Sequence, residues 1–174
     1  KELGKLDGLT VEEAEDIARI VGLGALKYFI LKVDARKNMT FNPKESIDFN
    51  GNTGPFIQYT HARICSVLRK ADEAAIDYTS HACSELLAEE IELIKSLTEF
   101  PSVITSAGDS HSPSIIAAYA YDLAKSFNGY YHDRSILRGE NTETRRRRLQ
   151  LASVVARTLR SAMKLLGIDV PERM

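Results

Sequence analysis

A glycine-proline turn that opens a long helical segment constrains this chain more than any other feature. From Gly51 to Lys70 the sequence is GNTGPFIQYTHARICSVLRK, and the Gly-Pro pair marks the point where a helix begins. Apolar side chains then recur at intervals of four, three and four residues, which places them on one face turned toward a core. This apolar stripe consists of Ile57, His61, Ile64 and Leu68, and Ala71 and Ala75 continue it.

A second stripe on the same predicted helix carries rings and cations. It lies about 150° from the apolar stripe, at roughly 100° per residue, so it cannot serve the same core. Its members are Phe56, Tyr59, Arg63 and Lys70. Rings that stack on unpaired bases, beside cations that meet phosphates, are typical of sites for single-stranded RNA loops. Periodicity alone favours the alternative of a helix packed on both sides, with Phe56 and Tyr59 in a second interface and Arg63 in a salt bridge.

Length and composition favour an ordinary globular core. The chain has 174 residues, of which 44% are hydrophobic, so we expect it to fold without a metal ion or a disulfide. Cys65 and Cys83 show no CxxC spacing, and free thiols are expected. The formal net charge of -1 argues against a protein that coats nucleic acid non-specifically. Any RNA site must therefore be local.

The sequence shows no pattern that would direct it to a membrane. No apolar run reaches the roughly 18 residues of a membrane span. The first ten residues, KELGKLDGLT, lack the apolar block of a secretory signal. We therefore expect a cytoplasmic protein with no membrane partner.

Helical periodicity predicts an all-α fold, a helical bundle entered through a helical and irregular lead-in. Residues 1–50 form the predicted lead-in, and residues 51–174 form the bundle. A capping box from Thr10 to Glu13 starts the first helix, which we expect to bend or break near Gly22 and Gly24. After the break, an apolar side is expected to consist of Leu26, Phe29, Ile30 and Val33. Residues 34–53 are predicted to be irregular, with a short extended piece through Met39, Phe41, Ile47 and Phe49.

Further helices are predicted after the central one. An acidic helix from about Ser80 to Leu97 should direct Leu86, Leu87, Ile91 and Ile94 inward, and a shorter helix should span Phe100 to Thr105. Ser112 and Pro113 start another helix, whose buried side is Ile115, Ile116, Tyr119, Leu123 and Phe127. The last begins near Asn141 or Thr142, ends at Gly167, and carries the apolar residues Leu149, Ala152, Val155, Ala156, Leu159, Met163 and Leu166.

For catalysis by this chain alone the sequence offers little. His61 lies on the apolar stripe, where a buried hydrogen bond is the expected role. His81, His111 and His132 show no spacing typical of metal ligands. Asp109, Ser110 and His111 are neighbours in sequence, but adjacency is no evidence for a triad, which is assembled in space. We predict no catalytic residue and no metal site.

The central segment resembles the GNTGPYxQYxHxR motif found in arginyl-tRNA synthetases, where the catalytic body meets the anticodon-binding domain. The matching residues are Gly51, Asn52, Thr53, Gly54, Pro55, Gln58, Tyr59, His61 and Arg63. The span from Pro113 to Met174 is similar to the DALR-type anticodon-binding domain of that family, through YAYDLAKSFNGYYHDRSIL, RRRLQLASVVARTL and LLGIDVPERM. AEDIARIVGLGALKYFIL is similar to the segment after the family's catalytic core, so the resemblance covers essentially the whole chain.

The resemblance implies a class I arginine-tRNA ligase, which joins arginine to its tRNA using ATP and Mg²⁺ and is expected to be a monomer. The HIGH-type and KMSKS-type motifs that serve ATP and arginine in the family are absent from this sequence. We therefore expect a C-terminal fragment that binds no cofactor itself and does not charge tRNA alone. The PERM ending matches the natural C-terminus of the family.

The resemblance also implies a set of tRNA-binding residues. In the family, the motif helix, a tyrosine region late in the domain and the terminal methionine surround the splayed anticodon loop, where the middle cytosine matters. Carried onto this chain, these positions are Phe56, Tyr59, Arg63, Tyr131 and Met174. Phe56 stands where tyrosine is usual, so it keeps a ring for stacking and lacks the hydroxyl.

A run of four arginines, residues 145–148, opens the last predicted helix. Cations near the positive end of a helix dipole are mildly unfavourable, and an anionic partner would offset that cost. We expect Arg146 and Arg147 to meet tRNA phosphates. The alternative, which a charge run in isolation favours, is a solvated face paired with Glu140 and Glu143.

A different class of function fits the same rings. A helical interaction module could dock a protein through the Phe56 and Tyr59 face, as exposed aromatic and arginine clusters often do. RNA binding should weaken steeply with added salt, whereas an aromatic protein interface should respond modestly. The salt response therefore separates the two hypotheses.

Overall fold

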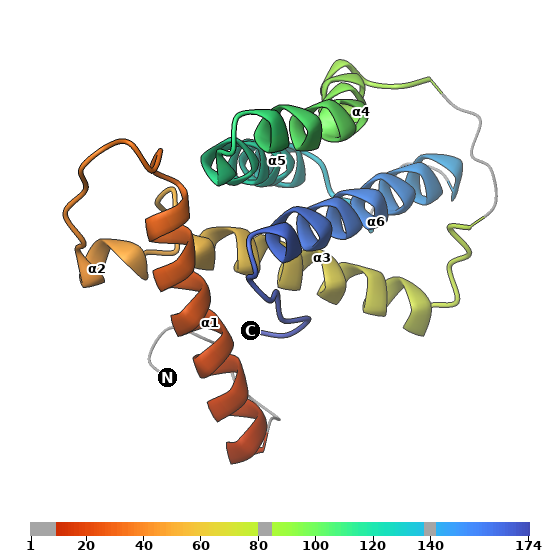
Figure 1. Ribbon diagram of the computed structural model, residues 1–174. Helices are drawn as coiled ribbons and strands as arrows, with labels where there is room; N and C mark the ends of the chain where they lie inside the picture. Colours follow the sequence, from red (N-terminus) through yellow and green to blue (C-terminus); the bar gives the residue numbers. More distant parts are fainter. Residues whose placement is uncertain (1–9, 80–84, 138–141) are drawn as a thin grey trace.

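The computed structural model describes residues 10–79, 85–137 and 142–174, and helices dominate these ranges (Figure 1). The elements are α1 (Val11–Leu31), α2 (Pro43–Ser46), α3 (Gly54–Glu73), α4 (Ala88–Asp109), α5 (Pro113–Asp133) and α6 (Thr142–Leu165). No strand occurs within the described ranges. The prediction of an all-α fold is therefore confirmed.

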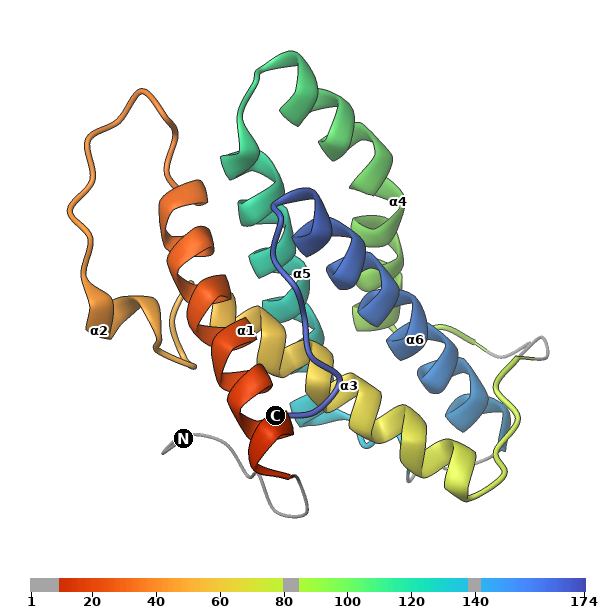
Figure 2. The ribbon, with the colours of Figure 1, turned by 60° about the horizontal axis from the view of Figure 1, so that its bottom comes forward.

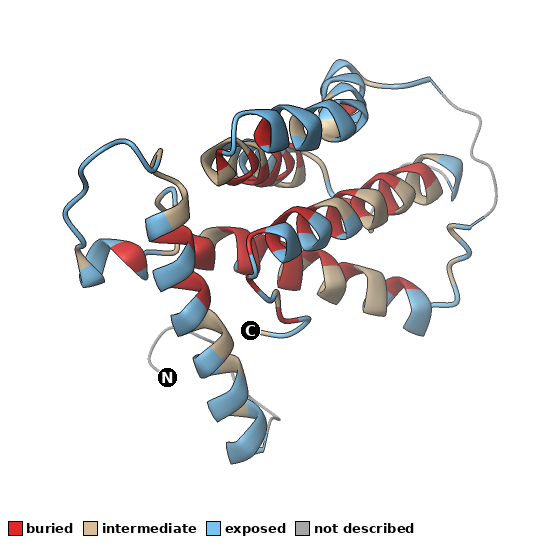
Figure 3. Ribbon diagram, viewed as in Figure 1, coloured by how far each residue is buried: buried red, intermediate tan, exposed pale blue. Residues whose placement is uncertain are grey.

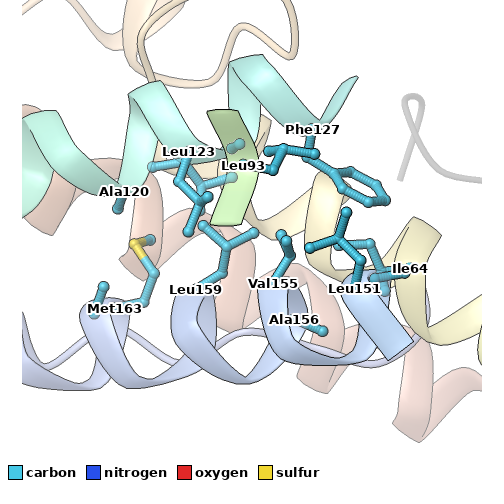
Figure 4. Close-up of a cluster of buried hydrophobic side chains, with 14 of the residues drawn as sticks. Ile64, Leu93, Ala120, Leu123, Phe127, Leu151, Val155, Ala156, Leu159 and Met163 are labelled. Carbon is cyan, nitrogen blue, oxygen red and sulfur yellow. The ribbon is translucent and has the colours of Figure 1, made fainter. Parts of the chain in front are cut away.

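The core lies where α3, α5 and α6 face one another, and α4 closes it by packing on α5 and α6. Figure 3 shows the buried residues on the facing sides of these helices. The close-up in Figure 4 shows how side chains from separate helices meet there, with Ile64 of α3, Leu93 of α4, Phe127 of α5 and Leu159 of α6 all nearly inaccessible to solvent. The apolar stripes predicted for the helices that became α3, α5 and α6 supply most of this core.

α1 is one continuous helix, so the predicted break at its glycines is wrong. The capping box is confirmed: the Glu13 amide donates to Thr10 Oγ1 at 3.2 Å and the Thr10 amide donates to Glu13 Oε2 at 2.8 Å. Gly24 and Gly54 both serve the crossing of α1 over α3: a Cβ on Gly54 would lie 2.6 Å from the Gly24 carbonyl oxygen, and a Cβ on Gly24 would clash with the Gln58 side chain. Only glycine permits backbones to approach this closely. Of the expected apolar side, Phe29 is buried, Val33 is half-buried, and Leu26 and Ile30 are exposed.

The segment between α1 and α3 is irregular apart from the single turn α2, and the predicted extended piece is wrong. Asn42 caps α2 by accepting the Lys44 amide at 3.1 Å, and Pro43 occupies its first turn. Phe41 packs edge-on against Phe29 of α1, with ring centroids 5.1 Å apart. The four residues do not alternate: Met39, Phe41 and Ile47 are exposed, and Phe49 is half-buried.

α3 follows the prediction closely. Thr53 caps it by accepting the Phe56 amide at 3.3 Å, and Pro55 lies in the first turn. Within the predicted apolar stripe, Leu68 is half-buried and the other members as far as Ala71 are buried. Ala75 is wrong as a continuation, because it lies beyond the helix end, exposed, with a left-handed φ of 51°.

α4 differs most from expectation. It is one helix that continues through Pro101, where two helices were predicted, and it begins at Ala88; residues 80–84 lie outside the described ranges. Its buried side carries Glu90 and Leu93. Leu87 is half-buried, and the other predicted inward residues are exposed: Leu86, Ile91 and Ile94. The carboxylate of Glu90, in the first turn of α4, is buried, whereas the prediction assumed that the acidic residues of this helix face solvent.

α5 and α6 agree with expectation. α5 begins at Pro113, although the Ser112 hydroxyl bonds the Ser114 hydroxyl at 2.8 Å and caps no amide. α6 begins at Thr142, and Asn141 lies outside the described ranges. Gly167, with φ of 67°, ends the last helical turn and redirects the chain. The C-terminal segment, residues 166–174, then runs back across α3 (Figure 2).

Candidate nucleic-acid interface

A cavity of about 410 Å³ opens on the side of α3 that faces away from the core. α3, the end of α5 and the C-terminal segment form its walls. It is lined by Tyr59, Ala62, Arg63, Ser66, Val67, Arg69, Lys70, Tyr131, Arg173 and Met174. Its volume falls within the range of roughly 300–1,000 Å³ that is usual for ligand pockets. Four predicted site residues, Tyr59, Arg63, Tyr131 and Met174, therefore meet at one place.

Arg63 occupies the centre of what we call the cavity cluster, which comprises Tyr59, Arg63 and Tyr131. Its guanidinium carbon lies 4.8 Å from the ring centroid of Tyr59 and 5.5 Å from that of Tyr131, within cation-π range. Arg63 Nη1 also donates to Asn128 Oδ1 at 2.8 Å, and Asn128 Nδ2 donates to Thr60 Oγ1 at 2.7 Å. The guanidinium thus contacts two rings and an amide, which orient it without cancelling its charge.

The cavity walls carry cations. Arg63, Arg69, Lys70 and Arg173 line the cavity, and its lining within the described part of the chain includes no aspartate or glutamate. Glu172, the nearest acid along the chain, pairs with Arg160 at 2.6 Å. A hollow whose lining side chains carry one sign of charge concentrates ligands of the opposite sign. The cavity is therefore suited to an anionic ligand with unsaturated rings.

The C-terminal segment is fixed in place by side chains of α3. Gln58 Nε2 donates to the Asp169 carbonyl at 2.8 Å, and His61 Nδ1 lies 3.0 Å from the Pro171 carbonyl. Burial lowers the pKa of His61, so the imidazole is neutral and its Nδ1 proton is the one donated. The expectation of a buried hydrogen bond for His61 is confirmed.

Phe56 lies apart from the cavity. It is half-buried and packs on the core, with its ring centroid 5.4 Å from that of Tyr121 in α5. The predicted stripe of rings and cations is therefore divided: its Phe56 end is packed, as the alternative of a doubly packed helix proposed. The remainder, Tyr59, Arg63 and Lys70, lines the cavity, with Tyr59 40% exposed.

The run of four arginines, residues 145–148, also lies outside the cavity. Arg147 Nη2 is 3.1 Å from Glu90 Oε2, and the Tyr130 hydroxyl donates to Glu90 Oε1 at 2.8 Å; we call these three residues the Glu90 cluster. Arg148 joins it and donates from Nη1 to the Ser135 carbonyl at 2.9 Å. Burial raises the pKa of Tyr130. A solvated face is therefore wrong for Arg147 and Arg148, which are buried, and neither Arg146 nor Arg147 lines the cavity.

Sequence reasoning missed three contributors to the cavity region. Arg69 adjoins Lys70 in α3, but the stripe was drawn through Lys70 alone. Asn128 was a detectable signal, because an amide beside Phe127 on an apolar helix is unusual without a partner. Arg173 could not be assigned from local sequence, since only the path of the C-terminal segment brings it there.

Other candidate chemistry is limited in the part of the chain that the structure describes. No three His, Cys, Asp or Glu side chains are grouped to hold a metal ion there. No helix in those ranges is long and apolar enough to cross a membrane. Cys65 is a free, half-buried thiol whose pKa is raised by burial, while Cys83 and His81 lie outside the described residues.

The fold and the cavity are those of a helical domain suited to an unpaired stretch of nucleic acid, and comparison with known proteins agrees. Residues 57–174 match the family model described as the DALR anticodon binding domain. An arginine-tRNA ligase of Phocaeicola vulgatus is 67% identical over 175 residues, which is 99% of this chain and 29% of that protein. A Bacteroides thetaiotaomicron arginine-tRNA ligase is 64% identical over the whole chain and 30% of its own length.

Solved structures show the same relationship. Thermus thermophilus arginyl-tRNA synthetase superposes with a TM-score of 0.87 at 34% identity, covering 98% of this chain and 29% of that one. Plasmodium falciparum arginyl-tRNA synthetase gives 0.81 at 28% identity, over 91% of this chain and 28% of that one. This chain belongs to the family of DALR anticodon-binding domains. It spans about 29% of the length of the curated relatives it matches.

Proposed function

We propose that this chain is the tRNA-recognising, C-terminal part of an arginine-tRNA ligase. It binds the anticodon arm of the tRNA for arginine, and the relatives named above support this assignment. Ligation itself, with arginine, ATP and Mg²⁺, is assigned to the remainder of a full-length enzyme that acts as a monomer in the cytoplasm. This chain contributes recognition and no catalytic residue.

The observation that carries the proposal is the electropositive cavity beside the cavity cluster. Unpaired bases stack on aromatic rings whatever their identity, while cations meet the phosphates on either side. Tyr59 presents an accessible ring, and Arg63 contacts two rings and the Asn128 amide, so its positive charge is oriented toward the cavity by neutral groups. A splayed anticodon loop offers both the bases and the phosphates that such walls require.

Each lining residue has a proposed role. Tyr59 and Tyr131 stack on bases, and Arg63 donates to a base edge or phosphate from its remaining N–H groups. Arg69, Lys70 and Arg173 meet phosphates, and Met174 packs on a base. Outside the cavity, half-buried Arg146 stays a proposed phosphate contact. Phe56 and Arg147 support the fold around the site, because each is committed to neighbours within the bundle.

The rival function, a protein-interaction module, is disfavoured by one contact. It requires Phe56 and Tyr59 on a common open face, but Phe56 packs against Tyr121. Of the two rings, only Tyr59 is exposed, at 40%. The cavity beside it is lined by the cations Arg63, Arg69, Lys70 and Arg173, which suit the phosphates of a nucleic acid.

Filter binding of the chain to the arginine tRNA, with and without a changed anticodon, tests the proposal. Neutralising about four phosphates of a single-stranded loop gives a log-log salt slope of roughly −3, or about fiftyfold between 50 and 200 mM salt. The altered anticodon should weaken binding by about tenfold. Equal affinity for both tRNAs, or a nearly flat salt response, would exclude anticodon recognition in this cavity.

A further inference from the structure

One side of α3 holds the C-terminal segment through backbone carbonyl groups. Gln58 bonds the Asp169 carbonyl at 2.8 Å, His61 bonds that of Pro171 at 3.0 Å, and Arg69 Nη1 bonds that of Glu172 at 3.0 Å. Gln58 and His61 are almost completely buried. Because the acceptors are main-chain atoms, these bonds fix the path of the segment whatever side chains it carries.

The fixed path begins in the core and ends in the cavity. Ile168, near the start of the segment, is 2% exposed and packs in the core. Arg173 and Met174, five and six residues later, line the cavity together with Tyr59 and Arg63. Arg160 adds an ion pair to Glu172 immediately before them. The last two residues thus reach the cavity only along a route that α3 determines.

α3 therefore has two roles at the cavity. It supplies one wall directly, and it holds in place the C-terminal segment, which supplies another wall. Tyr59 and Arg63 point into the cavity, whereas Gln58 and His61, one and two positions from them, point to the C-terminal segment. Successive residues on a helix are rotated by roughly 100°, so neighbouring positions serve different surfaces. The anchors lie outside the residues that line the cavity.

We propose that Gln58 and His61 are positioning residues for tRNA binding, which act by holding the C-terminal segment so that Arg173 and Met174 complete the cavity. This inference rests on the proposed function, since it assigns the anchors a part in the same tRNA site. When an anchor is removed, the segment carbonyl that it bonded is left without a donor, which is costly while that carbonyl stays buried. The segment therefore moves away from α3 so that water can bond this carbonyl. The cavity then loses one wall while Tyr59 and Arg63 remain.

A double-mutant cycle in the 174-residue chain separates positioning from general stability. His61→Leu keeps a similar volume without the donor, and His61→Asn restores a donor near the Nδ1 position. A variant that ends at Glu172 lacks the two wall residues and disturbs no buried group. Binding to the arginine tRNA is measured for each change alone and for His61→Leu in the shortened chain, with circular dichroism to confirm folding.

The expected pattern is non-additive. The shortened chain should bind about tenfold more weakly and His61→Leu about fivefold, while His61→Asn stays within about twofold of the wild type. In the shortened chain, His61→Leu should change affinity by less than about twofold, because the residues through which it acts are gone. Equal losses from His61→Leu in both lengths of chain would overturn the proposal.

Two further measurements keep the inference decisive. Hydrogen exchange of residues 166–174 should accelerate in Gln58→Leu and His61→Leu, and it should be unchanged in Glu73→Gln, a substitution at an exposed position at the end of the same helix. Unchanged exchange in the anchor variants contradicts the proposal.

If the shortened chain binds tRNA like the wild type while Tyr59→Ala binds it weakly, the positioning role is wrong and the proposed function stands. If Tyr59→Ala also binds normally, the proposed function itself fails.

Discussion

The cavity cluster and the Glu90 cluster are built from the same residue types and differ in one group, a carboxylate. In the Glu90 cluster, Arg147 meets a glutamate that is wholly inaccessible to solvent, and the side chain of Arg147 is only 11% exposed. In the cavity cluster, Arg63 lies between two tyrosine rings and bonds an amide. The first arrangement satisfies its charges internally, whereas the second leaves a positive charge directed at an open hollow.

Adjacent residues of α5 belong to opposite clusters. Tyr130 donates to Glu90 and is buried, while Tyr131, the next residue, lines the cavity beside Arg63. The helical rotation of roughly 100° per residue separates them. Aromatic and arginine content therefore cannot distinguish a cluster that is closed within the fold from one that is open to a ligand. The difference lies in whether a carboxylate pairs with the arginine, and here Glu90 of α4 pairs with Arg147 of α6.

The largest expected effect comes from removing that acid. Glu90→Leu leaves Arg147 and Arg148 buried without their carboxylate, so the free energy of unfolding should fall by about 3 kcal/mol in urea denaturation. The tRNA affinity of the folded protein should not change. Glu89→Gln is the matched control, since its exposed pair with Arg134 at 3.5 Å contributes less than about 1 kcal/mol. A loss for Glu90→Leu that is as small as the loss for Glu89→Gln would show that the Glu90 cluster does not stabilise the fold.

Removing a ring from the cavity cluster should produce the reverse pattern. Tyr59→Ala should weaken tRNA binding by about 1–3 kcal/mol, the usual contribution of one stacked base, with little change in unfolding free energy because the ring is partly exposed. Phe56→Ala is the matched comparison on the same helix: it should destabilise the fold by about 2 kcal/mol and leave affinity nearly unchanged. Losses of tRNA affinity of similar size in both variants would contradict the prediction that Tyr59 contacts tRNA while Phe56 only stabilises the fold.

A smaller effect is expected from one cation of the cavity wall. Lys70→Gln should reduce the magnitude of the log-log salt slope of tRNA binding by about 1 at most, because one phosphate contact is lost. Lys95→Gln, on the exposed side of α4 where its ammonium pairs with Glu92 at 2.7 Å, should leave the slope unchanged. Identical salt slopes for the two variants would show that Lys70 contacts no phosphate of the bound tRNA.

The smallest effect concerns the buried side of α3. Burial lowers the pKa of His61 in the folded state, whereas the unfolded chain retains the ordinary value of 6.5. The unfolded state therefore binds more protons below that value, so this histidine's contribution to stability is present above pH 6.5 and falls as the solution is acidified. Urea denaturation at pH 7 and pH 5 should show a smaller pH dependence for His61→Asn than for the wild type. An unaltered pH dependence would mean that His61 is not buried as a neutral base.

Much of the bundle was predictable because its helices obey local rules. The stripe on α3, the Pro113 start of α5 and the Gly167 end of α6 follow from periodicity and from capping chemistry. The failures arose where a distant partner reversed a local preference. Gly24 permits the close crossing of α1 and α3 instead of breaking a helix, and Glu90 is buried because two arginines from α6 reach it.

The candidate site divides in the same way. Tyr59 and Arg63 share a helix face, which periodicity shows, and the resemblance to the synthetases added Tyr131 and Met174. The structure brings these four together and places Phe56 and Arg147 outside the cavity, against Tyr121 and Glu90, which lie far away in sequence. Arg173 depends on the path of the C-terminal segment, which no local pattern encodes.

Whether the cavity cluster holds the anticodon itself is tested most directly by a cycle that combines Tyr59→Ala with a changed middle anticodon base. Affinities are measured for both proteins against both tRNAs at one salt concentration. If the ring and the base meet, each change alone weakens binding by about tenfold and the two together cost little more than either one. Fully additive losses would contradict direct contact and would place the anticodon elsewhere on the domain.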